Sequence, residues 1–400
     1  MTDLKAIGLI FTKNDDGTSY SVKGGDPLIT EVNVPSRHNG LLVSSLDKAA
    51  FSGYKQLKSV TLPDSITVIP QDAFKGCTSL SEVRLPSACR QIGESSFMDC
   101  ISLVSINLPA TLYTIDSNAF CGCEAITEIS LPENIHVGNW AFNRCKGLKR
   151  ISIPGTMSYI NRGMLAGCTG LEEIRLPESV TDIYEWAFSG CTSLRKAEIT
   201  SVTAVRDWAF NGCTSLAAIT FPKATTELGN HVFDGCTRLK EVTLEGSVKS
   251  IGSNAFVDCC MLENVSFGPY APPVMKTEYD PISGQYITYE PSISCFHTVN
   301  VKAFLNCTEL KEISIPESIV GIYEYAFAGC TDLTSISIPK SVLFIKEGIL
   351  SGCTSIKVIR YAGTINEWKH IEKSNAWKCA VSDITVVCLD GSISVICSPQ

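Results

Sequence analysis

The chain has 400 residues, of which 44% are hydrophobic and 18% are charged, a composition typical of a folded protein rather than a disordered one. Its formal net charge is −8 and its Lys and Arg residues form no cluster, which argues against nucleic acid as a partner. No stretch approaches the roughly 18 uninterrupted apolar residues of a membrane-spanning helix, so we expect no membrane insertion.

The amino-terminal segment, residues 1–28, is expected to be a hairpin cap. Residues 9–11 and 19–22 flank residues 14–17 (Asn-Asp-Asp-Gly), whose Asp-Gly pair is typical of a β-hairpin turn. A repeat array needs an atypical terminal unit to cover its apolar end. The same turn lacks the downstream Glu of a calcium loop, so we expect no bound metal there. The apolar stretch before Lys13 is shorter than the roughly 7 to 15 residues of a signal peptide.

A repeat of 22 or 23 residues fills residues 29–361. Each copy contains an Ala-Phe-x-Gly-Cys motif or a variant of it, and one long step of 48 residues separates two copies. A period this regular predicts a single repeat solenoid, mainly β with short turns and helical pieces, of about 13–14 coils. The Phe of the motif, replaced twice by Leu, occurs at Phe51, Phe74, Phe97, Phe120, Phe142, Leu165, Phe188, Phe210, Phe233, Phe256, Phe304, Phe327 and Leu350.

Each copy, which we call a coil, is expected to contain two short strands and a turn. In the first arm, apolar residues such as Val83 and Leu85 alternate with outward residues, and the Pro that follows, here Pro86, ends the strand at a corner. The second arm, for example residues 179–183, is rich in β-branched types and should add another short strand. In the turn, Ala permits close approach, the Phe residues stack into a spine, and Gly permits a positive φ.

Twelve of the nineteen cysteines occupy one position of the repeat and are expected to form a buried ladder. Equivalent residues of stacked coils lie about 4.8 Å apart with parallel side chains, whereas a disulfide needs Cβ atoms about 3.5–4.5 Å apart that point toward each other. We therefore expect reduced thiols that pack as small hydrophobic side chains rather than disulfides. The twelve are Cys77, Cys100, Cys123, Cys145, Cys168, Cys191, Cys213, Cys236, Cys259, Cys307, Cys330 and Cys353.

Residues 268–298 interrupt the repeat, and residues 362–400 end it. The first segment accounts for the long step, and its Pro and Gly residues predict a loop extruded from one coil, the most mobile internal part of the chain. The second segment has a helical pattern at residues 365–372 and strand patterns at residues 384–389 and 392–397. We expect it to be the carboxy-terminal cap.

The Ala-Phe-x-Gly-Cys turns, the Ile-Pro corners and the 23-residue period closely resemble the BspA-type leucine-rich repeats, a class common in bacterial surface and secreted proteins. The resemblance covers residues 29–361. It implies a right-handed curved solenoid with one parallel sheet on its concave face, and a role in adhesion or protein binding. It also suggests a secreted or cell-surface protein, and no signal peptide or anchor is visible in this sequence.

The sequence contains no pattern that indicates catalysis or a cofactor. The histidines lie in different coils, without the spacing of a metal site or of paired catalytic carboxylates. Cys295 and His297 could be considered a nucleophile pair, but residues two apart on an irregular loop have no fixed hydrogen-bond geometry. We therefore expect a protein that is not an enzyme and that binds no cofactor. The histidines are His38, His136, His231, His297 and His370.

The expected function is that of a binding scaffold, and the outward face of the first arm is one candidate site. This face is polar and of mixed charge, so it could dock a protein partner from a host or from a bacterial surface. A solvated sheet face would look the same. Four of its central residues are Arg150, Glu173, Arg175 and Lys196.

The second candidate site is aromatic and would suit a glycan. Trp140, Trp186 and Trp208 precede the Ala-Phe pair, at a position that is polar in most other coils, and Tyr184 lies two residues before Trp186. Trp and Tyr are favoured binding anchors, and their flat faces can stack on sugar rings. The alternative interpretation is that these rings only pack between neighbouring coils.

Overall fold

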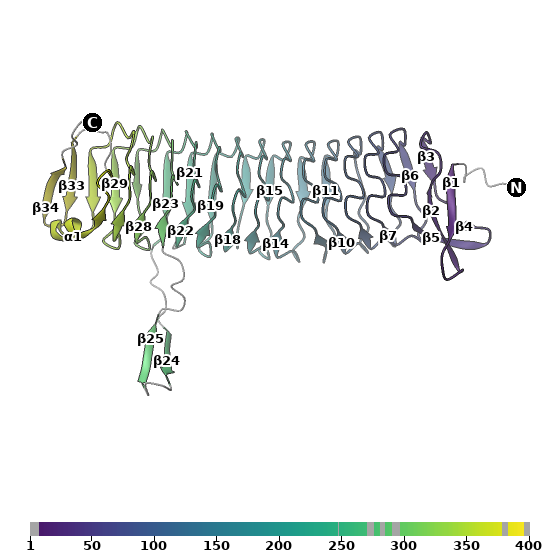
Figure 1. The fold of residues 1–400 in the computed structure, drawn as a ribbon, viewed down its shortest axis with the longest axis horizontal. Coiled ribbons are helices and arrows are strands. Elements are labelled where there is room, and N and C mark those ends of the chain that lie inside the picture. The colour runs from purple at the N-terminus through teal and green to yellow at the C-terminus, as the bar shows by residue number, and fades with distance from the viewer. Residues whose placement is uncertain are drawn as a thin grey trace. The chain divides into compact units, whose positions relative to one another are not determined.

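The computed structural model describes residues 8–246, 248–269, 276–280, 285–289, 297–377 and 383–395. The chain forms two compact units, Met1–Ala217 and Ala218–Gln400. Each is a mainly β solenoid built from successive coils (Figure 1), so the predicted fold class is confirmed. Among the described residues, no helix has the length and apolar character that crossing a membrane requires.

The first unit opens with a small sheet of mixed direction. Strands β1 (Leu9–Lys13) and β2 (Ser19–Gly24) pair antiparallel, and Gly17 in their connecting turn has φ +68°. β2 pairs in parallel with β5 (Leu41–Leu46), which in turn pairs antiparallel with β4 (Arg37–His38). The boundary of the predicted cap at residue 28 stays a prediction.

Short strands form the first arm of the repeat, as predicted. In most of them the middle residue is buried and its two neighbours are exposed, so the outer face is polar. Adjacent strands pair in parallel at equivalent positions, as Glu128 does with Arg150. The first-arm strands of this unit are β3 (Glu31–Asn33), β6 (Ser59–Thr61), β8 (Glu82–Arg84), β11 (Glu128–Ser130), β13 (Arg150–Ser152), β15 (Glu173–Arg175) and β17 (Lys196–Glu198).

The second arm is a strand of two residues in each coil. Its second residue is a fully buried aliphatic side chain, such as Ile92 or Ile115, which explains why β-branched residues recur there. In the first unit these strands are β7 (Val68–Ile69), β9 (Gln91–Ile92), β10 (Thr114–Ile115), β12 (His136–Val137), β14 (Tyr159–Ile160), β16 (Asp182–Ile183) and β18 (Ala204–Val205).

The turn that follows places the spine of aromatic rings. Two residues of positive φ flank the Ala-Phe pair, for example Trp186 (φ 56°) and Gly190 (φ 71°) around Phe188. The Phe side chains between them are fully buried and stacked, with ring centroids 5.5 Å apart for Phe51 and Phe74. The predicted spine is therefore confirmed.

The ladder cysteines lie beside this spine, and their predicted burial is confirmed. Their Sγ atoms donate to the backbone carbonyl oxygen of the spine residue one coil earlier, as Cys100 does to Phe74 at 3.1 Å and Cys330 does to Phe304 at 3.2 Å. Burial raises the pKa of the thiols, to about 12 for Cys191. A buried thiol with a raised pKa is a packing group rather than a nucleophile.

The second unit is built from the same two arms. Its spine rings Phe233, Phe256, Phe304 and Phe327 stack with centroids 4.9–5.3 Å apart. Its first-arm strands are β19 (Ala218–Phe221), β21 (Glu241–Leu244), β23 (Asn264–Phe267), β27 (Glu312–Ser314), β29 (Ser335–Ile338), β31 (Val358–Tyr361) and β33 (Ile384–Cys388). Its second-arm strands are β20 (Glu227–Leu228), β22 (Ser250–Ile251), β26 (Thr298–Val299), β28 (Gly321–Ile322), β30 (Phe344–Ile345) and β32 (Glu372–Lys373).

The long step of the repeat does not interrupt the stack of coils within this unit. The rings of Phe256 and Phe304 are 4.9 Å apart by centroid although 48 residues separate them in sequence, and Ile251 pairs with Val299. The solenoid therefore resumes directly after the insertion.

The inserted segment contains a hairpin where the sequence predicted only a loop. Strands β24 (Lys276–Asp280) and β25 (Gln285–Tyr289) pair antiparallel. Both stretches contain Thr and Tyr, which favour strands. The mobility predicted for residues 268–298 stays a prediction, and residues 270–275, 281–284 and 290–296 of this segment lie outside the described residues.

The last turn of the second unit contains the helix α1 (Ile365–His370), close to the predicted range. Thr364 and Glu367 form a capping box, in which the Glu367 carboxylate accepts the Thr364 N–H at 2.7 Å. β33 then pairs antiparallel with β34 (Gly391–Val395). Cys388 is buried, whereas Cys379 and Cys397 lie outside the described residues.

Candidate functional site

The outer face of β11, β13, β15 and β17 in the first unit holds a groove of about 440 Å³. Its lining brings together all four charged residues that the sequence analysis named on this face, with Glu128 and Glu198 in addition. The small side chains of Ser130 and Ser152 also line the groove.

The charges alternate in sign along the first row of this face. Glu128 lies opposite Arg150 and Glu173 lies opposite Lys196, each at the same register of adjacent parallel strands. The Nη2 atom of Arg150 forms an ion pair with Oε1 of Glu128. Like charges at directly opposed positions would repel, so the alternation lets equivalent positions of successive coils stack.

The second row of the face has two serines and then two long charged side chains. Ser130 pairs with Ser152, and Arg175 with Glu198. Nε of Arg175 lies 3.5 Å from Oε2 of Glu198, and Nζ of Lys196 lies 2.6 Å from Oε1 of the same carboxylate. The hydrogen bond from Lys196 lowers the pKa of Glu198 and raises that of Lys196. In this row the groove is therefore lined by small side chains on β11 and β13 and by long charged side chains on β15 and β17.

These ion pairs are exposed and can be exchanged for the charges of a partner. The side chain of Arg175 is 87% exposed and that of Arg150 is 66% exposed. Ion pairs in water contribute little to stability, so little is lost when one is replaced. Because the lining has three acidic and three basic residues, its selectivity must come from the pattern of charges rather than from a net charge.

The three tryptophans of the aromatic surface share an unusual backbone conformation. Trp140, Trp186 and Trp208 have φ of 58°, 56° and 63°. Asn, Asp and Gly adopt this left-handed region readily, whereas bulky side chains are uncommon there. Other coils of this unit place Asp72, Ser95, Asn118 or Gly163 at the same position with positive φ. The polar residues at this position are therefore explained by the left-handed backbone. The sequence analysis did not predict this conformation, although Gly163 at the same position was a signal for it.

Trp140 and Trp186 come together across an intervening coil. Their ring centroids are 6.1 Å apart at an interplanar angle of 32°, and Gly163 lies under the Trp140 ring. The guanidinium carbon of Arg162 sits 4.6 Å from the Trp186 ring centroid, within the range of a cation–π contact. The rings are half-buried. Part of each ring therefore packs between coils, and part of its surface is exposed to solvent.

Tyr184 and Trp208 are the other two aromatic residues of this surface. Tyr184 packs edge-to-face on Tyr159, with centroids 5.7 Å apart. Trp208 occupies the equivalent position in the next coil and is also half-buried.

No metal-binding cluster occurs among the residues that the structure describes. Within those ranges, no three His, Cys, Asp or Glu side chains are arranged so that they could hold a metal ion. Nδ1 of His297 lies 3.1 Å from the backbone oxygen of Ser318. This ring nitrogen therefore makes a hydrogen bond within the solenoid. Cys295, the other member of the considered nucleophile pair, lies outside the described ranges.

Parallel two-arm coils around a spine of stacked rings, with a polar outer face, define a leucine-rich-repeat solenoid. The family described as BspA type leucine rich repeat region matches residues 44–172, 158–270 and 286–395, and the chain belongs to this family. Repeats of this kind generally present extended surfaces for binding.

Two solved structures extend the likeness to almost the whole chain. A leucine-rich repeat protein from Bacteroides ovatus is 25% identical with a TM-score of 0.71, and the match covers 94% of this chain and 98% of that one. A leucine rich cell surface protein from Faecalibacterium prausnitzii is 27% identical with a TM-score of 0.56 and the same coverage. No match is found among curated proteins.

Proposed function

We propose that the chain is a non-enzymatic scaffold that binds a protein partner through the groove on β11, β13, β15 and β17. The observation that carries the proposal is the set of six exposed charges of alternating sign around two serines. A protein segment with acidic and basic side chains at matching intervals could form ion pairs with these residues in place of the pairs that they form with one another. Because a relative in F. prausnitzii is described as a cell surface protein, we propose that the partner is a host or bacterial surface protein and that the role is adhesion.

The experiment compares capture of surface proteins by the wild-type chain with capture by an Arg150→Glu, Arg175→Glu variant. The matched control is Lys146→Glu, Arg195→Glu, which makes the same charge change at exposed, ion-paired residues outside the groove. We expect the groove variant to lose the partner and the control to keep it. Binding should also weaken as salt screens the exposed charges. Equal capture by both variants would contradict the proposal.

Glycan binding by the aromatic surface is the second candidate function, favoured by one observation. Three bulky Trp side chains occupy a backbone position where they are disfavoured by about 1 kcal/mol or more, and such positions are often retained for function. The variant Trp186→Asn, Trp208→Asn suits the local backbone and removes two rings. On a glycan array, loss of a bound glycan in this variant would support the second candidate, and unchanged binding would leave the rings as packing groups.

A further inference from the structure

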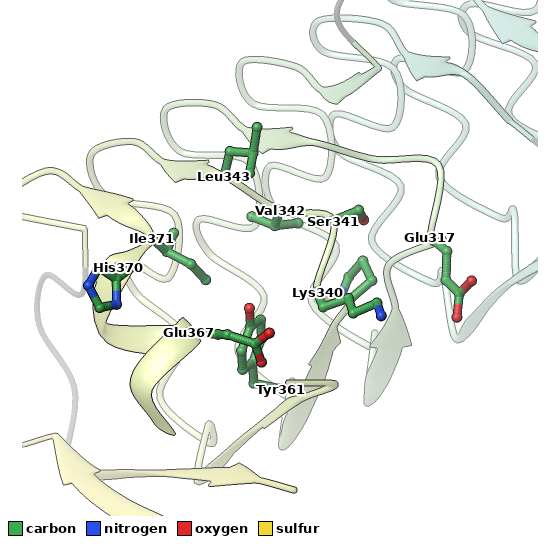
Figure 2. Close-up of a pocket in the computed structure, with 10 residues that line it drawn as sticks. Glu317, Lys340, Ser341, Val342, Leu343, Tyr361, Glu367, His370 and Ile371 are labelled. Atoms are coloured by element: carbon green, nitrogen blue, oxygen red, sulfur yellow. The ribbon is translucent and has the colours of Figure 1, made fainter. Parts of the chain in front are cut away.

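A pocket of about 640 Å³ lies in the second unit, between a corner of the last regular coil and α1 (Figure 2). The corner provides Pro339 to Leu343, and the terminal segment provides Tyr361, Glu367, His370 and Ile371. The pocket belongs neither to the groove nor to the aromatic surface of the first unit. Its volume lies within the roughly 300–1,000 Å³ of small-molecule sites.

The pocket exists because a helix replaces an extended corner. In regular coils, corners stack closely, as where the Ser341 hydroxyl donates to the backbone oxygen of Ile319 at 2.7 Å. In the next turn, α1 stands where the corner would be. A helix with its side chains is about 10–12 Å wide, whereas stacked strands are about 4.8 Å apart. The wider element therefore leaves space above the corner formed by residues 339–343.

The floor of the pocket is apolar. Val342 is 1% exposed, Tyr361 5% and Ile371 7%. At the rim, Leu343 is 65% exposed, although the equivalent residues of many other coils are polar. Among these equivalents are Thr67, Arg90, Thr181, Thr203, Thr226 and Lys249. Two other coils have Tyr113 and Val320 at this position, so Leu343 is distinguished by its large exposed area beside the pocket rather than by being apolar.

One polar group sits within this floor without a protein partner. Tyr361 is only 5% exposed, and its hydroxyl makes no hydrogen bond with any of the described residues. Figure 2 shows this hydroxyl beside the Glu367 carboxylate, between the corner that carries Lys340 and the helix that carries His370. Because this hydroxyl is not one of the buried side-chain atoms without a partner, it lies within the small exposed area of Tyr361. A ligand in the pocket could therefore form a hydrogen bond with it.

The rim offers both acceptors and donors. Glu317 and Glu367 are acidic, and Lys340 is basic and lies close enough to lower the pKa of Glu367, after the larger effects of the Thr364 hydrogen bonds. Nδ1 of His370 lies 2.7 Å from the backbone oxygen of Asn366, which directs its N–H there and leaves Nε2 as an acceptor. Charges of both signs at the rim give neither a strong anion nor a strong cation site.

We propose that this pocket binds a neutral saccharide. A sugar ring combines an apolar C–H face for Leu343 with hydroxyl groups for Tyr361, Glu317 and His370. A purely apolar occupant would leave the Tyr361 hydroxyl buried without a partner, and an ionic one would meet charges of the wrong sign. The pocket can hold this ligand whether or not the groove of the first unit binds a protein.

The test uses the full chain and saturation-transfer NMR with glucose, galactose, mannose, fucose, N-acetylglucosamine, maltose and lactose as probes. We expect at least one to bind with a Kd below about 10 mM. Tyr361→Phe, which removes one hydroxyl, should weaken this binding about tenfold, equivalent to about 1.4 kcal/mol. Tyr323→Phe is the matched control, because this half-buried tyrosine of the same unit lies outside the pocket lining.

A second variant keeps the test independent of folding. Leu343→Ser alters an exposed rim side chain, and Lys249→Ser makes the matched change at the equivalent position of another coil of the same unit. We expect weaker binding only for Leu343→Ser. Absence of binding by every probe, equal binding by Tyr361→Phe and wild type, or loss of binding in Trp186→Asn, Trp208→Asn alone would overturn the proposal.

Discussion

The indole of Trp140 covers Gly163 of the following coil so closely that a Cβ at position 163 would lie 2.0 Å from the Cε3 atom of the ring. The same relationship occurs in the second unit, where a Cβ at Gly348 would lie 2.5 Å from Cε1 of Tyr325. In both cases the two residues occupy the same repeat position with positive φ. In these two places a glycine in the next coil leaves room for the large ring, whereas Trp186 is followed at this position by Trp208.

Gly163→Ala should destabilise the first unit. A left-handed backbone costs an L residue about 1–2 kcal/mol, and the added Cβ would also displace the Trp140 ring. The free energy of unfolding in urea should fall by at least this amount, whereas Gly155→Ala, whose Cβ would meet no atom within 4 Å, should change it little. Adding Trp140→Ala should recover the part caused by the clash. Equal stability of the two glycine variants would contradict this account.

Phe97→Ala and Phe97→Leu should differ sharply in stability. Phe97 is fully buried between Phe74 and Phe120, with ring centroids 5.2 and 5.3 Å away. Truncation to Ala leaves a cavity and should cost about 3–5 kcal/mol. Leu should be tolerated far better, because the chain itself has Leu165 at this repeat position. Denaturation followed by circular dichroism measures both, and a similar loss for the two variants would refute the spine as the main core.

Stability should decline as the pH rises above about 9, because of the ladder thiols. Burial raises the pKa of Cys191 from 9.0 to about 12. Below pH 9 the thiol is protonated in both states and stability is unaffected. Between pH 9 and 12 only the unfolded state ionises, so each such thiol lowers the free energy of unfolding by about 1.4 kcal/mol per pH unit. Urea denaturation at pH 8, 9 and 10 would measure this decline. In Cys191→Ser, the free energy of unfolding should fall less steeply with pH, by the contribution of one thiol.

The ladder thiols should be reduced and unreactive in the folded protein. Their side chains are buried beside the spine, and thiolate attack requires ionisation and access. Titration with a thiol reagent should detect few groups in the native state and at least twelve after denaturation without reductant. Fewer than twelve would mean that some of the ladder cysteines form disulfides.

Glu198→Gln should affect binding and the titration of Lys196 more than stability. The carboxylate accepts from Lys196 at 2.6 Å and lies 3.5 Å from Arg175, but all three side chains are exposed. The melting temperature should therefore remain within error. The pKa of Lys196, raised by this carboxylate, should fall toward its usual value in an NMR titration, and partner capture should weaken. A large drop in melting temperature would show that the pair is structural.

The repeat, its two arms, the stacked Phe side chains and the buried cysteines could all be predicted from the sequence. These features follow from local patterns: alternation sets which side chains face inward, Pro86 and its equivalents end a strand, and the period places Phe74 and Phe97 one above the other. The insertion was also located, but its hairpin was missed, because a short strand pair depends on register between β24 and β25 rather than on the repeat.

The contacts between residues of different coils could be seen only in the folded chain. The register of adjacent strands joined Arg175 and Lys196 to Glu198, and the width of α1 opened the pocket above Leu343. The left-handed backbone of Trp140 and its contact with Trp186 over Gly163 also appeared only in three dimensions. The physical reason is that a linear pattern specifies which face of a coil a residue occupies, whereas the contacts across that face depend on side-chain size and backbone conformation in the neighbouring coils.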